Sequence, residues 1–496
     1  MNIAHHLTQA AQRFPEQTAL IFADQRWSYA QLESESAAVA ANLKTLGIFA
    51  GDRVALYLPN VPQFVQSYYA LQRLGAIAVT LSALLKKREI AHEVNDCGAR
   101  ILITASTLLE NVPTQAELPS VEHLIVVGGS RREHRPFASL LEVAPLPDVC
   151  SMDADDGATI LYTSGTTGYP KGAVLTHGNV ISNVAATVHY SGVTPEDRLL
   201  CFLPLFHCFG QNFIMNTCFA SGATLVLHTK FEAEEILRSI QANEVTMFFA
   251  VPTVYKRLYD AKLPPEAFRT VRYYFSAAAK MPESLPERWQ TRYGLPIHEG
   301  YGLTECSPFA CYNHENRWVA GSVGTPITDV EMKVVDLESG VPLVPKAVGE
   351  ICIKGPNVMR GYWNATQATA QVIDAEGWLH SGDVGYVDED GYYFIVDRVK
   401  EMINPGGFTV SPSEIEDVLC EHPKVADACV VGVPHDDLGE AIKAFVVAEG
   451  VLSAEEVLKF CHQEMAKHKV PHFVEFVEEI PTSPTGKKLR RLLKDR

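Results

Sequence analysis

The stretch TILYTSGTTGYPKG, residues 159–172, carries the most information about the fold and the chemistry of this chain. Its apolar start is typical of a buried strand, and a loop rich in glycine and hydroxyl residues follows. Glycine lets backbone N–H groups come close to an anion, hydroxyl groups donate further hydrogen bonds, and lysine adds a positive charge. The stretch therefore predicts a strand that leads into a binding loop for a polyphosphate group. The residues expected to bind that group are Thr163, Ser164, Gly165, Thr166, Thr167, Gly168 and Lys171.

This loop differs from the P-loop found in many nucleotide-binding proteins. A P-loop ends in Gly-Lys-Ser or Gly-Lys-Thr and leads into a helix, whereas residues 173–175 here are typical of another strand. The glycines and threonines alone are equally compatible with a flexible polar hairpin. Support for phosphate binding therefore has to come from the rest of the chain.

The composition limits the classes of function. The chain has 496 residues, with 42 Lys and Arg against 59 Asp and Glu, so its formal net charge is −17. Nucleic-acid binding requires a basic surface, and we therefore expect no nucleic-acid partner. A chain of this length also needs more than one hydrophobic core.

Targeting and redox features favour the cytoplasm. We find no apolar run long enough for a signal peptide or for a transmembrane helix. The eleven cysteines are scattered without a CxxC pair, which favours free thiols in a reducing compartment. We expect a cytoplasmic protein with no transmembrane segment.

The first part of the chain alternates strand-like and helix-like patterns. Ser28 and Gln31 predict a capping box ahead of an amphipathic helix, which Gly47 ends. Further elements are expected at 54–58 (strand), 64–74 (helix), 101–103 (strand) and 124–127 (strand). Strands that alternate with helices indicate parallel α/β layers, in which ligands bind beyond the C-terminal ends of the strands.

The texture changes near residue 325. Short strands, expected at 330–335 and 349–353, are separated there by Gly, Pro and Asp turns, which favours a β-rich subdomain. We predict an α/β fold whose large N-terminal domain, residues 1–399, contains layered α/β subdomains and this β-rich subdomain.

The remaining residues, 400–496, are expected to form a small, mobile α+β domain. Ser411 and Glu414 predict a capping box ahead of a helix, and Ser453 with Glu456 predicts another. Strands are expected at 425–433 and 444–447.

Five strings of the sequence carry a resemblance: YTSGTTGYPKG (162–172), LPLFH (203–207), EGYGLTE (299–305), GWLHSGDVGYVDEDGYYFIVDRVKEMI (377–403) and PTGK (484–487). In this order they resemble the motifs of the acyl-adenylate-forming superfamily, which includes acyl-CoA synthetases, peptide-synthetase adenylation domains and luciferases. The resemblance extends over essentially the whole chain. It implies that a carboxylate attacks the α-phosphate of ATP, that pyrophosphate leaves, and that the acyl group then passes to a thiol. Charge accumulates on phosphoryl oxygens in this chemistry, so cations and oriented donors dominate the catalysis.

The resemblance also implies roles for single residues. Lys487 would contact the α-phosphate and the carboxylate, although its local sequence alone favours a solvated lysine in a basic tail. Glu305 would bind Mg²⁺, because a hard cation prefers carboxylate oxygen. Thr304 would bond the α-phosphate, Tyr301 would pack against adenine, and Gly302 would also contact the nucleotide. The expected catalytic set is Lys487, Lys171, Thr304 and Glu305.

The other motif residues would hold the ribose and the mobile domain. Asp383 would accept hydrogen bonds from the ribose hydroxyls, with Arg398 beside it. Lys400 matches the hinge about which the C-terminal domain would rotate between adenylation and thiol transfer. Gly406 and Gly407 would face the pantetheine arm of coenzyme A, although a simple turn explains them equally well.

The segment at residues 206–210, FHCFG, limits the choice of acid. It contains no carboxylate to pair with an α-ammonium group, so we expect an acid without an α-amino group. The run from 211 to 220 is mostly apolar, which suits an alkyl or aryl tail. The acyl-pocket residues predicted here are His207, Phe209, Gly210, Gln211 and Val251.

The strings most resemble those of bacterial medium- and long-chain fatty-acid–CoA ligases, which use ATP, Mg²⁺ and coenzyme A. Three alternatives remain: an aryl-CoA ligase, a ligase that loads an acyl carrier protein in trans, and a non-catalytic relative. The segment SAAAKMP (276–282) departs from the family pattern, because Lys280 stands where relatives usually carry proline.

Overall fold

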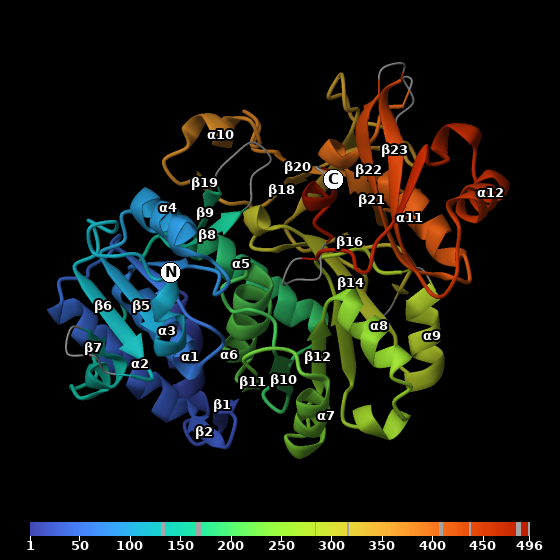
Figure 1. Ribbon diagram of the computed structural model, residues 1–496. Helices are drawn as coiled ribbons and strands as arrows, with labels where there is room; N and C mark the ends of the chain where they lie inside the picture. The colour runs from blue at the N-terminus through green and yellow to red at the C-terminus, as the bar shows by residue number, and fades with distance from the viewer. Residues whose placement is uncertain are drawn as a thin grey trace.

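The computed structural model describes residues 1–129, 134–163, 170–282, 284–314, 317–405, 410–435, 438–482 and 488–494. Two large sheets with helices around them make up most of the molecule (Figure 1). A four-stranded sheet and a three-stranded sheet lie above them in that view. The predicted fold class, layered α/β with a β-rich subdomain and a small α+β domain, is confirmed. No helix in the described ranges is long and apolar enough to cross a membrane.

The eight-stranded sheet contains the strand of the glycine-rich stretch. Its order is β19-β9-β8-β4-β3-β5-β6-β7, and β8 runs parallel to β4 but antiparallel to β9. The strand predicted after the loop at residues 173–175 is thus confirmed. The strands are β3 (Arg53–Tyr57), β4 (Ile77–Thr80), β5 (Ile101–Ala105), β6 (His123–Val127), β7 (Arg135–Pro136), β8 (Gly157–Thr163), β9 (Lys171–Thr176) and β19 (Gly361–Tyr362).

The nine-stranded sheet has the order β16-β15-β14-β13-β12-β10-β11-β1-β2. The strands from β1 to β14 in this order are all parallel, so the C-terminal ends of β12, β13 and β14 meet at one edge. The strands are β1 (Thr18–Phe22), β2 (Gln25–Ser28), β10 (Arg198–Cys201), β11 (Thr224–Leu227), β12 (Met247–Ala250), β13 (Tyr273–Ser276), β14 (Ile297–Gly302), β15 (Phe309–Tyr312) and β16 (Thr325–Pro326).

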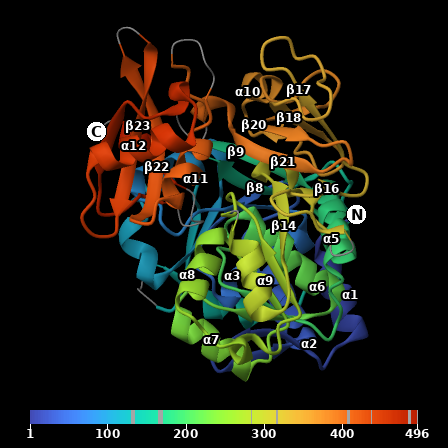
Figure 2. The ribbon, with the colours of Figure 1, turned by 90° about the vertical axis from the view of Figure 1, so that its right-hand side faces the viewer.

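Helices lie between the two large sheets and on their outer faces (Figures 1 and 2). One hydrophobic core contains side chains of both sheets and of the helices between them. Those inner helices are α1 (Ala4–Arg13), α2 (Tyr29–Thr45), α3 (Pro62–Leu74), α5 (His177–Ser191) and α6 (Thr217–Ser221). The outer helices are α4 (Lys87–Cys97), α7 (Ala233–Ala242), α8 (Pro252–Asp260) and α9 (Ser284–Tyr293).

Local signals explain where these helices begin and end. Ser28 accepts a hydrogen bond from the backbone of Gln31, and the Gln31 side chain accepts one in return, so the predicted capping box is confirmed. At the end of α3, Gly75 has φ of 70°, and a Cβ there would lie 2.4 Å from the Met152 sulfur. Glycine is therefore needed at this helix end for its conformation and for its small size.

The change of texture near residue 325 coincides with a four-stranded antiparallel sheet of order β17-β18-β20-β21. Its strands are β17 (Glu331–Val335), β18 (Gly349–Lys354), β20 (Leu379–Val387) and β21 (Tyr393–Arg398). The short helix α10 (Thr366–Ala370) lies between β19 and β20 in the chain.

The last residues build the three-stranded sheet β22-β23-β24 with its own hydrophobic clusters. Its strands are β22 (Val425–His435), β23 (Gly439–Ala448) and β24 (Phe473–Phe476). The helices are α11 (Pro412–Glu421), α12 (Ala454–Glu464) and α13 (Arg491–Lys494).

One of the two capping boxes predicted in this part is only half formed. Ser453 and Glu456 bond reciprocally, as expected. Ser411 does accept a hydrogen bond from the Glu414 backbone, but its hydroxyl also donates to Asp397 at 2.8 Å. The Glu414 carboxylate pairs instead with Lys469. The predicted return bond of this box is therefore wrong, because an ion pair competes for the carboxylate.

Candidate active site

The motif residues gather where strands of three sheets end. Thr163 is the last residue of β8 and Gly302 the last of β14, while Asp383 lies in β20 and Arg398 ends β21. The expectation of a site beyond the C-terminal ends of the strands agrees with this placement. Eight predicted site residues lie outside the described ranges: Ser164, Gly165, Thr166, Thr167, Gly168, Gly406, Gly407 and Lys487.

Glu305 is the centre of one cluster of polar side chains. Its Oε1 accepts hydrogen bonds from the Tyr362 hydroxyl at 2.8 Å and from Thr163 Oγ1 at 3.4 Å. The Lys171 Nζ lies 5.4 Å from the centroid of the Tyr362 ring. We call Thr163, Lys171, Glu305 and Tyr362 the phosphate-side cluster. It brings the two ends of the glycine-rich stretch to the end of the EGYGLTE string.

Tyr362 was missed by the sequence reasoning. It lies outside all five strings, and no periodicity of the neighbouring residues distinguishes it from a core aromatic residue. The pairing of β19 with β9 places it, since Tyr362 lies opposite Ala173. Burial and the nearby Glu305 carboxylate raise the pKa of Tyr362 well above its usual value. The Tyr362 hydroxyl therefore stays a neutral donor to Glu305.

Asp383 is the centre of a second cluster. Its Oδ2 accepts a hydrogen bond from the Tyr301 hydroxyl at 2.8 Å, and its Oδ1 lies 3.0 Å from Arg398 Nε. The β20–β21 register sets Asp383 directly opposite Arg398, and Asp383 itself is buried. We call Tyr301, Asp383 and Arg398 the ribose-side cluster. Each carboxylate oxygen thus already has one partner within the protein, which leaves the second lone pair of each for a ligand.

Tyr301 is expected to stay neutral for the same reasons as Tyr362. Burial, followed by the Asp383 carboxylate, raises the pKa of Tyr301 well above its usual value. Its hydroxyl is engaged with Asp383, so the predicted packing against adenine would involve only the face of its ring. The next residue, Gly302, must be glycine, because a Cβ there would lie 1.6 Å from the Pro308 carbonyl oxygen.

Thr304 connects these clusters to the acid segment. Its Oγ1 lies 3.5 Å from Cys208 Sγ, a contact that the sequence did not indicate. Cys208 is buried and lies 3.8 Å from His207 Nδ1. The EGYGLTE and LPLFH strings, about a hundred residues apart, therefore touch through these side chains.

The predicted acyl-pocket residues are close-packed. His207 Nδ1 accepts a hydrogen bond from the Phe209 backbone at 3.2 Å, and burial lowers the pKa of His207 to about 4, so the ring is neutral. A Cβ at Gly210 would lie 2.3 Å from the Pro204 carbonyl oxygen. Val251 follows the C-terminal end of β12 and is buried.

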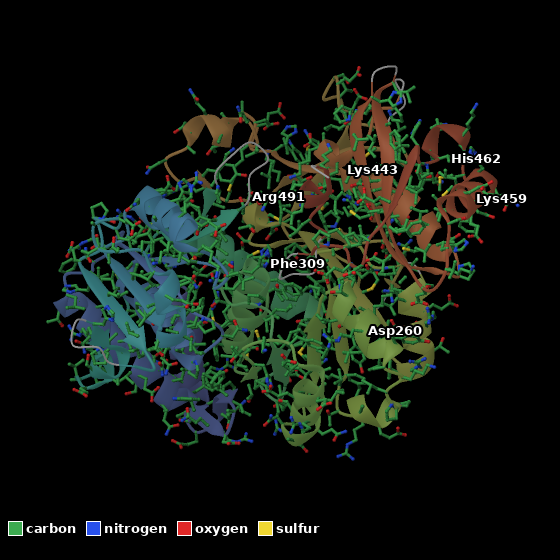
Figure 3. All side chains as sticks on the ribbon, in the orientation of Figure 1. Asp260, Phe309, Lys443, Lys459, His462 and Arg491 are labelled. Carbon is green, nitrogen blue, oxygen red and sulfur yellow. The ribbon has the colours of Figure 1, made fainter. Side chains whose placement is uncertain are left out.

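Aromatic rings surround this segment. Phe213 stacks on Phe275 with ring centroids 4.5 Å apart, and it meets Phe209 and Phe309 edge to face at 5.4 and 5.0 Å. Phe309 lies near the middle of the molecule in Figure 3. These rings come from three separate segments, the helix Phe209–Asn216, β13 and β15, so no local sequence pattern shows that they all meet.

The expectation of a mostly apolar run at residues 211–220 is only partly correct. The helix through this run buries Gln211, Asn212 and Asn216. Asn216 bonds Tyr69 and Asn212, at 2.7 and 3.1 Å. Gln211 donates to the Leu205 carbonyl at 3.1 Å, and its Oε1 finds no partner within the described residues. Amides in an apolar run could have signalled this buried polar network.

Two cations of the basic tail, Lys488 and Arg490, form ion pairs within the protein, whereas Arg491 and Lys494 are exposed. Arg490 bonds Glu416 at 2.8 Å, pairs with Glu401 and lies 3.8 Å from Asp397. Glu401 belongs to the turn Val399–Glu401 that follows β21, next to the predicted hinge residue Lys400, which is exposed. Arg490 therefore joins the end of the chain to the segment where the hinge is predicted. No pattern in the sequence around Arg490 indicates this role.

Lys280, the departure from the family pattern, reaches the C-terminal part. Its ammonium group pairs with Asp417 on α11, and both side chains are partly exposed. An ion pair between exposed groups contributes little to stability. It does, however, link the segment after β13 to the three-stranded part of the molecule.

Comparisons with known proteins agree with this picture. A model of the AMP-binding enzyme family matches residues 7–363, and a model of the AMP-binding enzyme C-terminal domain matches residues 414–487. A 4-coumarate–CoA ligase of Pinus taeda is 36% identical over 490 residues, which cover 95% of this chain and 90% of the relative. A long-chain-fatty-acid–CoA ligase of Bacillus subtilis (strain 168) is 33% identical over 525 residues, covering 98% and 93%.

Solved structures are similar over the whole length. The ATP-bound structure of MatB from Rhodopseudomonas palustris superposes with a TM-score of 0.93 at 30% identity, covering 100% of this chain and 99% of that chain. The apo structure of the same protein gives 0.82 with the same coverage. The arrangement of the present structure is therefore closer to that of the ATP-bound protein.

Proposed function

Because the chain belongs to the AMP-binding enzyme family, we propose that it is an ATP-dependent acid–thiol ligase. It activates a carboxylic acid as acyl-AMP with release of pyrophosphate, then transfers the acyl group to coenzyme A. The relatives named above, ligases for long-chain fatty acids and for 4-coumarate, support this class of reaction. The preferred acid in our proposal is a medium- or long-chain fatty acid, with an aryl acid as the alternative.

One observation carries the proposal. The residues of the phosphate-side and ribose-side clusters span the chain from Thr163 to Arg398, yet the short segment that contains Tyr301 and Glu305 contributes to both clusters. Because one short segment contributes to both clusters, the two clusters lie near enough to bind the ribose and the phosphates of one nucleotide at the same time. Lys171 and the donors of the loop supply positive charge and N–H groups for the phosphates.

The Glu305 carboxylate fits a Mg²⁺ site. Both described hydrogen bonds go to Oε1, and in the described part of the chain no hydrogen bond reaches Oε2. A carboxylate oxygen beside a phosphate loop is a donor that Mg²⁺ prefers. The ion, when bound, neutralises charge on the transferring phosphates. The hydroxyl groups of Thr163 and Tyr362 hold the carboxylate through Oε1, so Oε2 of Glu305 is the oxygen that would bind the ion.

Lys487 and the hinge complete the mechanism. We propose that Lys487 contacts the α-phosphate and the attacking carboxylate, and that Thr304 donates to the same phosphate. A domain of residues 400–496 would turn about Lys400, so that Gly406 and Gly407 reach the thiol path after adenylation. The closer match to the ATP-bound arrangement of MatB supports an adenylating pose here.

The residues around the predicted acyl pocket favour an acid whose tail carries no charge. The His207 ring is neutral, and the nearby rings of Phe209, Phe213 and Phe275 are apolar. An α-ammonium group would lack a carboxylate partner in residues 206–210. Alkyl and aryl tails both fit this apolar environment. The buried amide of Gln211, two residues after Phe209, is a polar group close to these rings in the sequence.

Acid-dependent pyrophosphate release with ATP and Mg²⁺ tests the proposal. We would compare straight-chain acids of increasing length with benzoate and cinnamate derivatives, each with and without coenzyme A. Continuous turnover that requires coenzyme A, with the highest kcat/KM for a straight-chain acid, supports a fatty acyl-CoA ligase. A preference for cinnamates selects the aryl alternative.

Two other outcomes would redirect or refute the proposal. A single burst that ends in bound acyl-AMP despite coenzyme A selects a carrier-protein acceptor, tested next with a pantetheinylated acyl carrier protein. No pyrophosphate release with any acid contradicts the proposed activity and favours a non-catalytic relative.

A further inference from the structure

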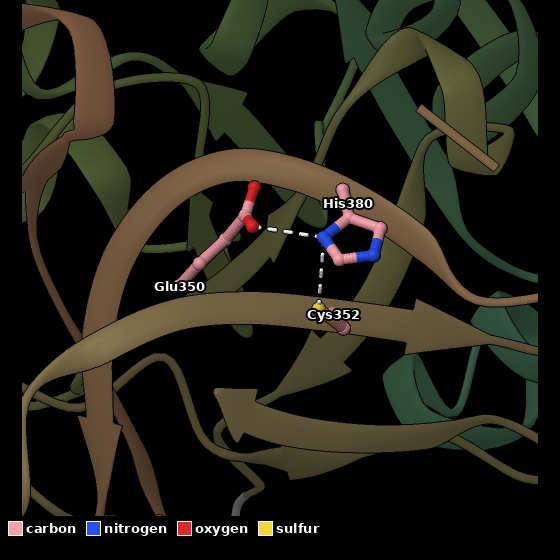
Figure 4. A group of neighbouring side chains, drawn as sticks. All are labelled: Glu350, Cys352 and His380. Carbon is pink, nitrogen blue, oxygen red and sulfur yellow. Dashed lines mark hydrogen bonds and ion pairs between the residues drawn. The ribbon is translucent and has the colours of Figure 1, made fainter. Parts of the chain in front are cut away.

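Three side chains of the four-stranded sheet meet outside both clusters of the active site (Figure 4). Glu350 and Cys352 lie on β18, and His380 lies on β20 in register with Cys352. His380 Nδ1 is 2.8 Å from Glu350 Oε2 and 3.6 Å from Cys352 Sγ. All three ligand atoms lie within 4.8 Å of one another. Carboxylate, thiol and imidazole thus point at a common position.

The separations fit a tetrahedral metal centre. With Zn–S of about 2.3 Å and Zn–N of about 2.0 Å, a tetrahedral angle sets sulfur and nitrogen about 3.5 Å apart. Cys352 Sγ and His380 Nδ1 are 3.6 Å apart, which is close to that separation. Nitrogen and carboxylate oxygen would be about 3.3 Å apart on the same ion. Glu350 therefore has to move by only about half an ångström relative to His380 from its present hydrogen bond.

Neighbouring groups contact two of these three side chains, Glu350 and His380. The second carboxylate oxygen of Glu350, Oε1, accepts a hydrogen bond from the Gly382 backbone at 3.0 Å, which turns Oε2 toward His380. The other ring nitrogen of His380, Nε2, lies 3.8 Å from Asp374 Oδ2. A metal-binding histidine commonly donates its second nitrogen to a carboxylate, which fixes the tautomer, and Asp374 would have to approach by about 1 Å to accept that hydrogen bond.

We propose that Glu350, Cys352 and His380 bind a zinc ion, with water in the fourth position. Thiolate and imidazole ligands favour Zn²⁺ over Mg²⁺, so this site differs in metal from the one proposed at Glu305. Binding forms a Zn–S bond, and the proton of the Cys352 thiol is released to solvent. Cys352 is buried, whereas His380 is about one-third exposed, so the ion and its water reach the site from the histidine side.

The proposed ion would stiffen the strand that carries the ribose-side cluster. His380 precedes Asp383 by three residues, and Ser381 between them donates to the Ile351 carbonyl on β18. Zinc would cross-link β18 to β20 next to this bond, in addition to the hydrogen bonds of the strands. Binding should therefore raise the Tm of the protein, as any ligand of the folded state does.

Cobalt substitution tests the site without relying on enzyme activity. The full-length protein would be freed of metal with a chelator and titrated with Co²⁺ alone. We expect one equivalent to bind and to give a thiolate-to-cobalt charge-transfer band together with strong tetrahedral d–d bands. One equivalent of Zn²⁺ should then displace the cobalt and remove both sets of bands.

Matched variants assign the bands to these residues. Cys352→Ser should remove the charge-transfer band, and Glu350→Gln should keep it while weakening Co²⁺ affinity by about 10-fold or more. Cys420→Ser, which alters an exposed thiol on α11, should change nothing. Far-UV circular dichroism of the metal-free variants checks that each is folded, and Glu350→Gln keeps the test decisive if Cys352→Ser does not fold.

The opposite results overturn the proposal. If no equivalent of Co²⁺ binds, the three side chains form only a hydrogen-bonded group. If the bands persist unchanged in Cys352→Ser and in Glu350→Gln, the metal binds elsewhere in the molecule.

Discussion

The nucleotide side and the acid side of the candidate site are built in different ways. Glu305 and Asp383 on the nucleotide side contact tyrosine, threonine and arginine side chains from distant segments. On the acid side, Phe213 packs against the rings of its aromatic neighbours. Glycine is required at position 210, because a Cβ there would clash with the Pro204 carbonyl oxygen. In our proposal, the polar pairs bind the nucleotide, whereas ring packing determines which acid fits.

The largest effect is expected at Lys487, which in our proposal contacts both the α-phosphate and the acid. Lys487→Ala should lower the rate of acyl-AMP formation by a factor on the order of 10² to 10³, because a charge that stabilises the transition state is lost. Pyrophosphate release measures this step. Thioester formation from supplied acyl-AMP should continue largely unchanged, since the thiol-transfer step would not use this lysine.

Lys494→Ala is the matched control. Lys494 is an exposed lysine of the same basic tail and lies on α13. Its rate should equal that of the wild type. Normal pyrophosphate release by Lys487→Ala would show that the C-terminal tail does not take part in adenylation.

Asp383→Asn tests the nucleotide side alone. The change removes the negative charge that pairs with Arg398 and that would accept hydrogen bonds from the ribose hydroxyls of ATP. Because hydrogen bonds to charged groups contribute about 1.5–3 kcal/mol each, the KM for ATP should rise about 10- to 100-fold. The relative kcat/KM values for different acids should stay constant. Initial rates at varied ATP, with two acids of different length, measure both quantities.

Asp388→Asn provides the control within the same string. Asp388 accepts backbone hydrogen bonds in the turn between β20 and β21, a role that asparagine also performs. An unchanged KM for ATP in Asp383→Asn, or a changed order of acids, would contradict the separation of the two sides.

Much of the nucleotide side could be predicted because its residues lie in strings that resemble those of a known family. Within one string such as EGYGLTE, the residues also stay close in space, because they lie at and just after the end of one strand. Thr163, Glu305, Tyr301 and Asp383 lie together as the strings imply. Tyr362 could not be found in this way, because only the pairing of β19 with β9 brings it near Glu305.

The acid side could be predicted only as a segment. Phe213, Phe275 and Phe309 are ordinary core residues in the sequence, and their meeting depends on how β13, β15 and the inner helices pack. Side-chain packing is a property of the whole fold and has no local signal. The Arg490 ion pairs were missed for the same reason, since their partners lie about 75 to 90 residues away.

Val251→Ala tests the acid side alone. The side chain is buried beyond the end of β12, and removing its methyl groups should enlarge the pocket and shift the preferred acid toward a bulkier tail. One methylene in such a pocket alters relative kcat/KM by about 10-fold or more. The KM for ATP should stay constant, which sharpens the contrast with Asp383→Asn.

Val245→Ala is the control, because this valine is equally buried but precedes the other end of β12. It should lower stability without changing the order of acids. The same order of acids in Val251→Ala and in the wild type would mean that this residue does not line the pocket.

Glu299→Gln tests the boundary between the two sides and should have the smallest effect. Burial raises the pKa of Glu299 to about 8, and its Oε1 has no partner among the described residues. The folded protein therefore binds this proton more tightly than the unfolded chain does. Stability should fall as the pH rises from the unfolded pKa near 4.5 through about 8, and a neutral glutamine removes this part of the decline.

Urea unfolding of both proteins at several pH values measures this difference. Between about pH 6 and about pH 8 the variant should gain on the order of 1 kcal/mol relative to the wild type. Activity with ATP and acid should change little if Glu299 is a neutral part of the packed wall. A constant stability difference across this range would mean that Glu299 is already ionised in the folded protein. A higher KM for ATP in the variant would then assign Glu299 to the nucleotide side.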